Sequence, residues 1–243
     1  MLFCEQKPHK VNSHSCQRHV SFSCCDRRDN GIKINIIGDS ITEGCGTSGP
    51  AYAYPSLLAD RTGATVRNFG VCGTRFARQT RPSEMPTFDL DFVGRAEEMP
   101  SDADLVLVFG GTNDFGHGDA PFGTFDDRTA DTFCGACHVL MRRLIERYPD
   151  AVIVFMTPLH RADENNPKTD SRTGKTYVLE DYVRQIRKTA AYYALPVLDL
   201  WGMSGLQPAV PLVTERYMPD GLHPNDAGHR ILCDRILGFL RAL

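Results

Sequence analysis

The stretch Ile34-Asn35-Ile36-Ile37-Gly38-Asp39-Ser40-Ile41-Thr42-Glu43-Gly44 decides the fold of this chain. It begins as a short apolar run and ends in turn residues, a pattern typical of a buried strand. In an open α/β sheet, ligands bind just beyond the carboxyl ends of the strands. Ser40, with glycines on both sides, therefore stands where a nucleophile would be placed.

Apolar runs and amphipathic stretches alternate from residue 32 to residue 243. We expect strands over residues 32–37, 65–68, 104–109, 151–156 and 197–200, and helices over residues 54–61, 88–99, 128–148, 179–193 and 227–240. Such alternation predicts parallel strands joined by right-handed crossovers, with helices on both faces of one sheet. One domain over residues 32–243 fits better than two. The polar insertion 160–176 follows the fourth strand, so we expect it at the mouth of a site.

The first 31 residues have a different composition, with Cys4, Cys16, Cys24 and Cys25 and almost no apolar periodicity. We interpret residues 1–31 as a poorly ordered extension. They lack the apolar core of a secretory signal, and the nine cysteines of the chain have irregular spacing, so free thiols in a reducing cytoplasm are expected. A metal site here would need paired zinc-type spacing, which the cysteines and histidines do not show.

The composition is that of an ordinary globular protein, with 42% hydrophobic and 23% charged residues. A net charge of −3 gives no general attraction to nucleic acid or to an anionic membrane. No apolar run approaches the roughly 20 residues that a membrane span needs. We therefore expect a small-molecule partner and no nucleic-acid or membrane partner. An exposed face of the helix expected over residues 128–148 leaves a homo-oligomer open.

Asp220-Gly221-Leu222-His223-Pro224 supplies the base that Ser40 lacks. A serine hydroxyl is a weak nucleophile until a neighbouring base takes its proton, and a neutral imidazole titrates near physiological pH. Asp220 precedes His223 by three residues, a spacing that makes neighbours on one helical turn. The carboxylate can then fix the tautomer and orientation of the imidazole.

Acyl transfer also needs N–H donors for the negative charge that develops on the carbonyl oxygen. Ser40 offers its own backbone N–H, Gly73 a backbone N–H with no side chain in the way, and Asn113 a side-chain amide. All three follow predicted strand ends. Gly70 is a rival to Gly73 in the segment Asn68-Phe69-Gly70-Val71-Cys72-Gly73.

These segments resemble the four sequence blocks of the SGNH hydrolases, also called GDSL-type esterases, from about residue 33 to the end. The blocks are Gly38-Asp39-Ser40, Gly73, Gly111-Thr112-Asn113-Asp114 and Asp220-Gly221-Leu222-His223. The resemblance implies a flavodoxin-like three-layer α/β/α sandwich with a central five-stranded parallel sheet. It also implies ester hydrolysis through an acyl-serine without metal or organic cofactor. By position, Ser40, His223 and Asp220 resemble the catalytic triad, and Ser40, Gly73 and Asn113 the oxyanion hole. Ile41 replaces the leucine of the family name.

Each residue also has a structural interpretation. Ser40 is a common helix cap, His223 fits a surface turn, and an aspartate such as Asp220 often bonds its own turn. We interpret Asp39 and Asp114, which flank candidate catalytic residues, as acceptors of backbone N–H bonds.

Two loop histidines, His117 and His160, are candidates for substrate binding, although loop histidines are usually only solvated.

Two other patterns favour structure over chemistry. Arg75, Arg78 and Arg81 follow Gly73 at helical spacing, and a solvated or ion-paired stripe is favoured over an acidic-substrate site. Cys134-Gly135-Ala136-Cys137-His138 matches the haem-attachment pattern, but it lies in a helix that must pack on the sheet. Buried cysteines acting as small apolar residues are the preferred interpretation.

The substrate is the least determined feature. The leading hypothesis is a small acyl ester, with acetyl esters of carbohydrates as the example that family analogy suggests. A lysophospholipase or thioesterase needs a long apolar groove, whereas the predicted loops are mostly polar. A non-enzymatic flavin-type module leaves His223, Asp220 and Asn113 without a reason to converge. A catalytically silent ester-binding relative is the other alternative.

Overall fold

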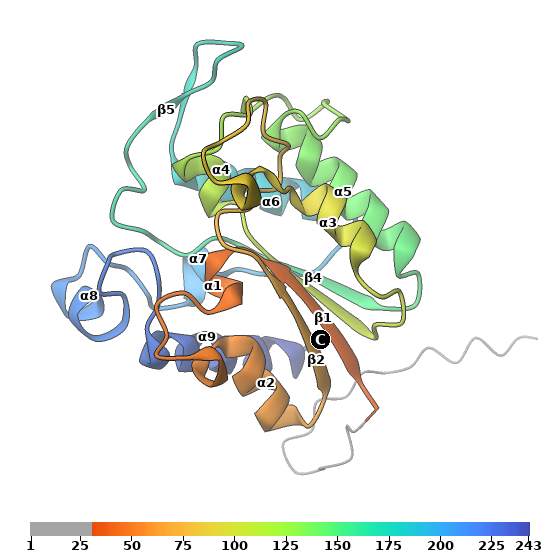
Figure 1. The fold of residues 1–243 in the computed structure, drawn as a ribbon. Helices are drawn as coiled ribbons and strands as arrows, with labels where there is room; N and C mark the ends of the chain where they lie inside the picture. The colour runs from red at the N-terminus through yellow and green to blue at the C-terminus, as the bar shows by residue number, and fades with distance from the viewer. Residues whose placement is uncertain (1–30) are drawn as a thin grey trace, which may run out of the picture.

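A five-stranded, all-parallel sheet forms the centre of the molecule (Figure 1). The computed structural model describes residues 31–243. The strands are β1 Lys33–Gly38, β2 Thr65–Gly70, β3 Leu105–Phe109, β4 Val152–Met156 and β7 Val197–Leu198, in the spatial order β2-β1-β3-β4-β7. Because β1 and β3 are buried on both faces, they read as near-continuous apolar runs.

Two helices cover one face of the sheet: α2 Tyr54–Thr62 and α9 Asp226–Leu240 (Figure 1). They bury Leu58 and Leu232 against sheet residues such as Ile36 and Leu107. Asn225 begins α9 by accepting the N–H groups of Ala227 and Gly228 with its side-chain oxygen. The last helix is thereby fixed two residues after His223.

Three helices cover the opposite face: α3 Phe92–Glu98, α5 Phe133–Arg147 and α6 Leu179–Tyr192 (Figure 1). Phe92, Phe133 and Ile186 pack there on the other side chains of the sheet. Two helix layers around a parallel sheet confirm the predicted three-layer fold. Cys134 and Cys137 are both buried within α5, as expected for small apolar residues of a helix that packs on the sheet.

Local capping moves two of the predicted helix boundaries. The helix predicted from residue 128 begins at Phe133, because the hydroxyl of Thr132 caps it by accepting the N–H of Gly135. The helix predicted over residues 88–99 is two elements: the 3₁₀ turn η2 Pro86–Asp89, and α3, which Asp91 caps. In both cases a side-chain cap, rather than the apolar pattern, sets the start of the helix.

Several short elements were not predicted. They are α1 Ser40–Glu43, η1 Pro50–Tyr52, α4 Thr112–Gly116, α7 Leu200–Met203, α8 Pro211–Tyr217 and the hairpin β5 Lys168–Thr169 with β6 Thr176–Tyr177. Elements of two to seven residues are too short to show a period of apolar residues. Both α1 and α4 start within three residues of a strand end, so they decide how the candidate site is built.

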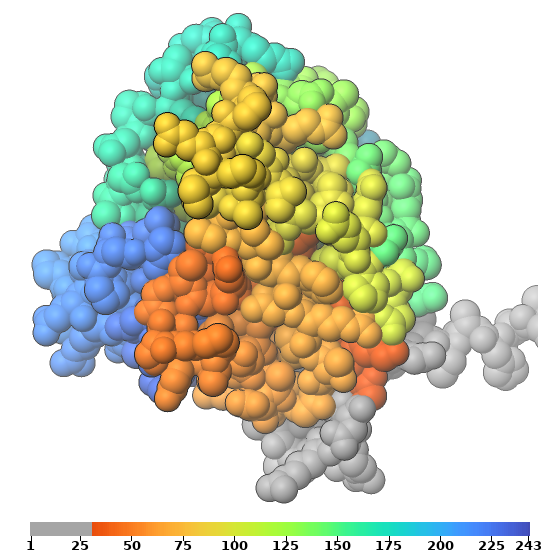
Figure 2. Space-filling model, viewed as in Figure 1, coloured from red at the N-terminus to blue at the C-terminus, as the bar shows by residue number. Residues whose placement is uncertain are grey.

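The carboxyl ends of the parallel strands lie at one edge of the sheet, and Ser40, Gly73 and Asn113 follow β1, β2 and β3 there. The segment after β1 and the C-terminal segment meet at the surface, where red-orange and blue atoms touch (Figure 2). Asp226 accepts there from the N–H of Ser48 at 2.8 Å and from its hydroxyl at 2.6 Å. Two segments far apart in sequence are thus held together beside the site.

Within residues 31–243 no helix is both long and apolar enough to cross a membrane. The expectation of a poorly ordered extension concerns residues 1–31 and, apart from Gly31, lies outside the described residues. Its four cysteines and its histidines lie outside them as well.

Candidate active site

Ser40 is the first residue of α1, and its hydroxyl lies 3.0 Å from Nε2 of His223. Asp39 caps this four-residue helix by accepting the N–H of Ile41 at 3.1 Å. Glycine at position 44 ends it in the left-handed conformation, with φ of 111°. The strand, the cap and the short helix therefore hold Ser40 at the carboxyl end of β1, facing a histidine 183 positions further along the chain.

Asp220 continues this chain of hydrogen bonds, because its Oδ2 lies 2.7 Å from Nδ1 of His223. Its Oδ1 accepts the backbone N–H groups of Leu222 and His223 at 2.9 and 2.7 Å. The contact is thus made in a tight turn, as Gly221 and Pro224 in this segment indicate, although the spacing of three residues also allowed a helical turn. Partial burial opposes ionisation, yet the hydrogen bonds from His223 and Leu222 hold the pKa of Asp220 below its ordinary value.

Asn113 lies in α4, directly after β3, and is buried. Its Nδ2 donates to the carbonyl oxygen of Thr74 at 3.1 Å, which orients the amide and leaves its second N–H for another acceptor. Thr74 follows Gly73, so this bond ties the two candidate oxyanion donors to one another.

The two candidate glycines have different surroundings. The N–H of Gly70 donates to Oδ1 of Asn68 at 2.8 Å, and a Cβ at Gly70 would lie 2.2 Å from the backbone nitrogen of Glu43. Gly70 thus lets β2 approach α1. Gly73 has φ of 76°, and among residues 31–243 no acceptor is bound to its N–H. Of the two N–H groups, that of Gly73 is the one available to a ligand.

Comparison with known proteins gives the family. The sequence model of the GDSL-like lipase/acylhydrolase family matches residues 36–231. The chain belongs to this family.

A GDSL lipase of Mycobacterium tuberculosis is 29% identical over 235 residues, which cover 93% of this chain and 88% of the relative. A solved protein from Lactobacillus plantarum is 29% identical with a TM-score of 0.73, over 92% of this chain and 99% of that one. A possible lipase from Chitinophaga pinensis is similar in fold, with a TM-score of 0.63, 20% identity, and coverage of 87% and 98%. This GDSL-family chain is a hydrolase of ester bonds.

The two aspartates beside Ser40 and Asn113 hold backbone in this GDSL-family site. Asp39 bonds the N–H of Ile41, and Asp114 accepts from Phe76 and Ala77, both at 2.9 Å. Burial raises the pKa of Asp39 to about 7 and that of Asp114 to about 6, although these N–H groups oppose the shift. Both are the structural acceptors that the sequence suggested.

Arg75 departs from the predicted solvated or ion-paired arginine stripe in being buried, although it does lie 3.9 Å from a carboxylate oxygen of Asp89. Its side chain is only 1% exposed, whereas Arg78 and Arg81 lie at the surface near aspartates. The guanidinium donates to the carbonyl oxygen of Phe88 and to Nδ1 of His117 at 3.1 Å. The helical spacing failed here because residues 74–80 form no helix: the segment folds inward over α4.

His117 contacts protein groups in the described structure. Its ring packs on Phe88 at 5.3 Å between centroids, and Nδ1 must accept from Arg75, since a guanidinium can only donate. Burial and the neighbouring Arg75 lower the pKa of His117 to about 4, so the ring is neutral at physiological pH. Phe88 also packs closely against Gly73, where a Cβ would lie 2.2 Å from its ring.

His160 is likewise engaged by its neighbours. Nδ1 lies 2.8 Å from Glu164 Oε2, and the ring packs on Trp201 with 3.8 Å between centroids. Substrate binding by His117 or His160 stays a prediction. Within the described residues both rings contact other protein side chains.

Residues of the polar insertion 160–176 contact both α4 and the turn of His223, and no sequence pattern indicates these contacts. Arg161 donates to the carbonyl and hydroxyl oxygens of Thr112, both at 3.2 Å, at the start of α4. Lys168 donates to the carbonyl oxygens of Asp114 at 2.7 Å, of Phe115 at 3.1 Å and of Gly118. These two cations hold both ends of the helix that carries Asn113.

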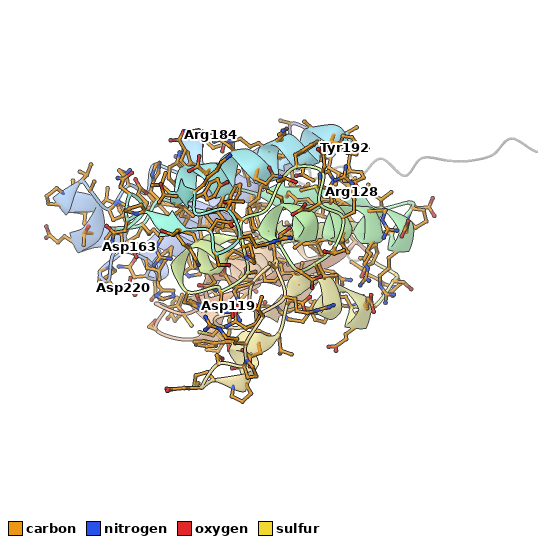
Figure 3. All side chains as sticks on the ribbon, turned by 90° about the horizontal axis from the view of Figure 1, so that it is seen from above. Asp119, Arg128, Asp163, Arg184, Tyr192 and Asp220 are labelled. Atoms are coloured by element: carbon orange, nitrogen blue, oxygen red, sulfur yellow. The ribbon has the colours of Figure 1, made fainter. Side chains whose placement is uncertain are left out.

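The same insertion reaches the turn that carries His223. The N–H of Ala162 donates to the carbonyl oxygen of Gly221 at 2.8 Å, and a Cβ at Gly221 would lie 2.7 Å from that of Ala162. Asp163 and Asp220 accordingly lie at the same end of the molecule (Figure 3). Residues 161–168 therefore connect the helix of Asn113 with the turn of His223.

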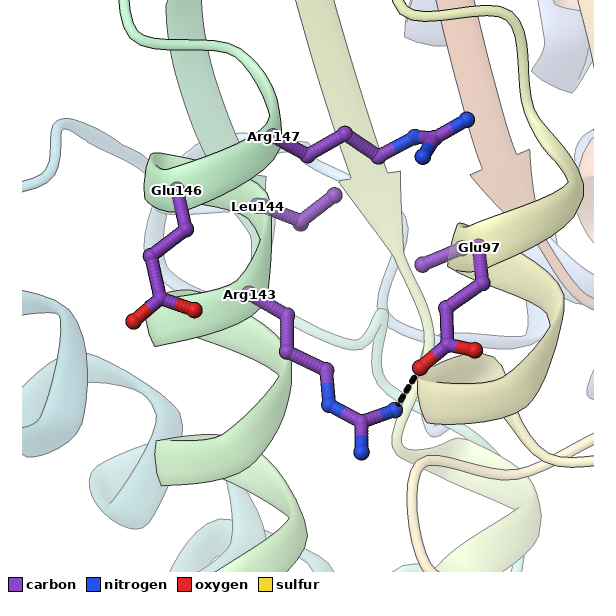
Figure 4. Close-up of a pocket in the computed structure, with 6 residues that line it drawn as sticks. Glu97, Arg143, Leu144, Glu146 and Arg147 are labelled. Atoms are coloured by element: carbon purple, nitrogen blue, oxygen red, sulfur yellow. Dashed lines mark hydrogen bonds and ion pairs between the residues drawn. The ribbon is translucent and has the colours of Figure 1, made fainter.

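A separate hollow of about 380 Å³ lies between α3 and α5. Glu97, Arg143 and Arg147 line it, and an ion pair between Arg143 and Glu97 crosses it (Figure 4). None of Ser40, His223, Asp220 or Asn113 lines this hollow, so it has no part in the candidate chemistry.

Proposed function

We propose that this GDSL-family hydrolase cleaves esters of small acyl groups through an acyl-Ser40 intermediate. The observation that carries the proposal is the continuous set of hydrogen bonds from the Ser40 hydroxyl through His223 to Asp220. In this proposal Nε2 of His223 takes the hydroxyl proton as Oγ of Ser40 bonds to the ester carbonyl carbon. The proton then passes to the leaving alcohol, and a water activated by the same imidazole releases the acid.

The oxyanion hole of the proposal consists of the backbone N–H groups of Ser40 and Gly73 and the free amide N–H of Asn113. Preorganised donors of this kind are typically worth about 3 kcal/mol each in barrier. The bond from Asn113 to Thr74 and the bonds from Asp114 to Phe76 and Ala77 support preorganisation, because they hold the segment after Gly73 against α4.

Small and polar surroundings of His223 favour a small acyl group. A Cβ at Gly46 would lie 3.0 Å from that of His223 and 2.5 Å from the Pro224 carbonyl oxygen. On the other side, Ala162 packs on Gly221 between the charged Arg161 and Asp163. These neighbours offer little apolar surface for contact with a long acyl chain, and they suit an ester whose alcohol is polar, such as a sugar.

The test is release of nitrophenol from acetyl, butyryl and octanoyl esters by the native chain, by Ser40→Ala and by Ser56→Ala. We expect the highest kcat/KM on acetate, a loss of roughly 10⁴-fold in Ser40→Ala, and no change in Ser56→Ala, whose hydroxyl bonds Pro50 instead. Labelling of Ser40 by a fluorophosphonate, read by mass spectrometry, locates the nucleophile. Higher turnover of the octanoyl ester would indicate a lipid substrate and contradict the small-acyl proposal.

Acetylated sugars extend the same test to the alcohol. Release of acetate from an acetylated xylo-oligosaccharide, absent in Ser40→Ala, supports a carbohydrate ester. A folded native chain that binds acetyl esters without hydrolysing any of them would instead indicate a silent ester-binding relative. A cytoplasmic location, action without a cofactor, and the absence of nucleic-acid and membrane partners stay predictions.

A further inference from the structure

Glu43, Cys45 and Cys72 form a cluster of metal-ligating side chains beside the candidate active site. A carboxylate oxygen and two sulfurs all lie within 4.8 Å of one another. Glu43 ends α1, which starts with Ser40, and Cys72 precedes Gly73. The three side chains therefore join the segment of the nucleophile to the segment of an oxyanion donor.

The backbone brings these residues together. Gly70, which has no side chain, lets the end of β2 approach the end of α1. The N–H of Cys72 then donates to Oε2 of Glu43 at 2.6 Å. On the α1 side of this contact, the N–H of Cys45 donates to the carbonyl oxygen of Ser40 at 2.8 Å. The carboxylate and both thiols are therefore held at one place by main-chain bonds.

We propose that Glu43, Cys45 and Cys72 bind one thiophilic divalent cation, such as Zn²⁺ or Cd²⁺, and that this ion inhibits ester hydrolysis. Two thiolates and a carboxylate are a ligand set that such ions prefer, and water completes a tetrahedron. Both thiols lose a proton to solvent on binding, so no redox step is involved. The inhibitory part of the proposal rests on the proposed function, whereas the binding part does not.

The cluster holds a carboxylate beside the two thiols, a third ligand that a cation would use and a disulfide would not. Both thiols are half-buried and free. Burial raises the pKa of Cys45 to about 11 and also raises that of Cys72, and the Glu43 carboxylate adds to both effects. A bound divalent ion would offset two of the three negative charges and stabilise both thiolates.

Inhibition follows from the geometry of the ligands. Bonds of about 2.3 Å to a tetrahedral ion place two sulfurs roughly 3.8 Å apart, so a bound ion fixes the relative positions of three ligand atoms that lie within 4.8 Å of one another. Cys72 precedes Gly73, so a bond from the Cys72 sulfur to an ion constrains the segment that carries the Gly73 N–H. Displacements of about 1 Å in a catalytic group can cost about 100-fold in rate.

Cadmium binding is measured first, in the full chain with Cys4, Cys16, Cys24 and Cys25 changed to serine. We expect one Cd²⁺ per chain, seen by its thiolate charge-transfer absorbance. Cys45→Ser and Cys72→Ser should each weaken binding by at least about tenfold, and Glu43→Gln should weaken it less. The control Cys134→Ala removes a buried thiol of α5 and should bind Cd²⁺ normally. Retention of the absorbance in both Cys45→Ser and Cys72→Ser would overturn the site.

Activity is measured second, on nitrophenyl acetate. Cd²⁺ should lower turnover, a chelator should restore it, and Cys72→Ser should resist the ion. Ser40→Ala should still bind Cd²⁺, so the binding result stands even if the esterase proposal fails. Protection of Cys45 and Cys72 from iodoacetamide by Cd²⁺ in the unsubstituted chain supplies a measurement free of folding effects. If peroxide joins Cys45 and Cys72 in a disulfide and the chain binds no cadmium, the two thiols are a redox pair and the metal-site proposal is wrong.

Discussion

Two kinds of aspartate surround the candidate site, one at the surface and one beneath it. The Asp220 side chain is 55% exposed, whereas Asp39 and Asp114 are only 1% and 4% exposed. The pKa of Asp220 lies below its ordinary value, but burial raises that of Asp39 to about 7 and that of Asp114 to about 6. All three accept backbone N–H bonds, so these bonds alone do not separate them.

Solvent and the second carboxylate oxygen make the difference. Water shields the charge of Asp220, and one of its oxygens remains for Nδ1 of His223. An ionised carboxylate at this position can stabilise an imidazolium. Asp39 and Asp114 lie where charge is costly, and their bonds instead fix the segments that carry Ser40 and follow Gly73. Adjacency in sequence to a candidate catalytic residue thus indicates a place in the site without saying which role the neighbour has.

Asp220→Asn is the strongest test of the contrast between the exposed Asp220 and the buried Asp39 and Asp114. Asparagine can still accept the N–H groups of the turn, but its amide cannot hold a positively charged imidazole or fix its tautomer. We expect kcat on nitrophenyl acetate to fall by roughly 10³-fold, within the range known for such substitutions. Unfolding by urea should change little, because the residue is exposed.

Asp234→Asn is the matched control, since Asp234 is also an exposed aspartate and pairs with Arg61 far along α9. It should keep full activity. A folded Asp220→Asn chain with native kcat would reduce Asp220 to a turn residue and remove the contrast between the two kinds of aspartate.

Asn113→Ala tests the buried part of the site. It removes the candidate oxyanion donor that Asp114 and Thr74 help to orient. Losing one oxyanion donor should lower kcat by roughly 100-fold and leave KM nearly unchanged. The lost bond to Thr74 should also cost about 1 kcal/mol of stability. Binding of a boronic acid that mimics the tetrahedral intermediate should weaken along with kcat. If boronate affinity stays native while kcat falls, the amide only supports the loop.

The sequence predicts those elements of this molecule whose apolar pattern extends over enough residues to be recognised. Strand β3 reads as Leu-Val-Leu-Val-Phe and is buried at every position, and all five strands of the main sheet were expected near their observed bounds. The sequence motif around Ser40 and the Asp-x-x-His spacing also led to residues that the fold brings together. Parallel strands bring their carboxyl ends to one edge, which makes such convergence predictable.

Contacts made by irregular segments could not be predicted in the same way. Arg75 looks like part of a solvated stripe, and only the inward fold of residues 74–80 buries it. Lys168 and Arg161 read as charges of a polar loop, yet they donate to carbonyl oxygens of α4 more than 45 positions away. No local period carries information about bonds over such separations, since they depend on how the loops close on the finished sheet.

Asp39→Asn tests the same contrast between exposed and buried aspartates at a buried residue. It is expected to have the smallest effect on the rate. Between pH 4 and 7 the folded chain keeps a proton on Asp39 that the unfolded chain has lost, so this residue lowers stability as pH rises through that window. Asparagine does not titrate and can still accept the N–H of Ile41. The variant should therefore gain stability over the native chain as pH rises from 4 to 7, by at most about 4 kcal/mol. Asp114 and His117 titrate in both chains, but the charge of Asp114 also raises the pKa of Asp39, so the difference reports Asp39 together with its coupling to Asp114.

Urea unfolding at pH 4, 5.5 and 7 measures this difference, and kcat at pH 7 should stay within a few-fold of native. A stability difference that does not change with pH would mean that Asp39 is ionised throughout, in spite of its burial. A fall in kcat as large as that of Asp220→Asn would give Asp39 a direct part in the chemistry. Either result would show that the buried aspartate does more than hold the backbone of α1.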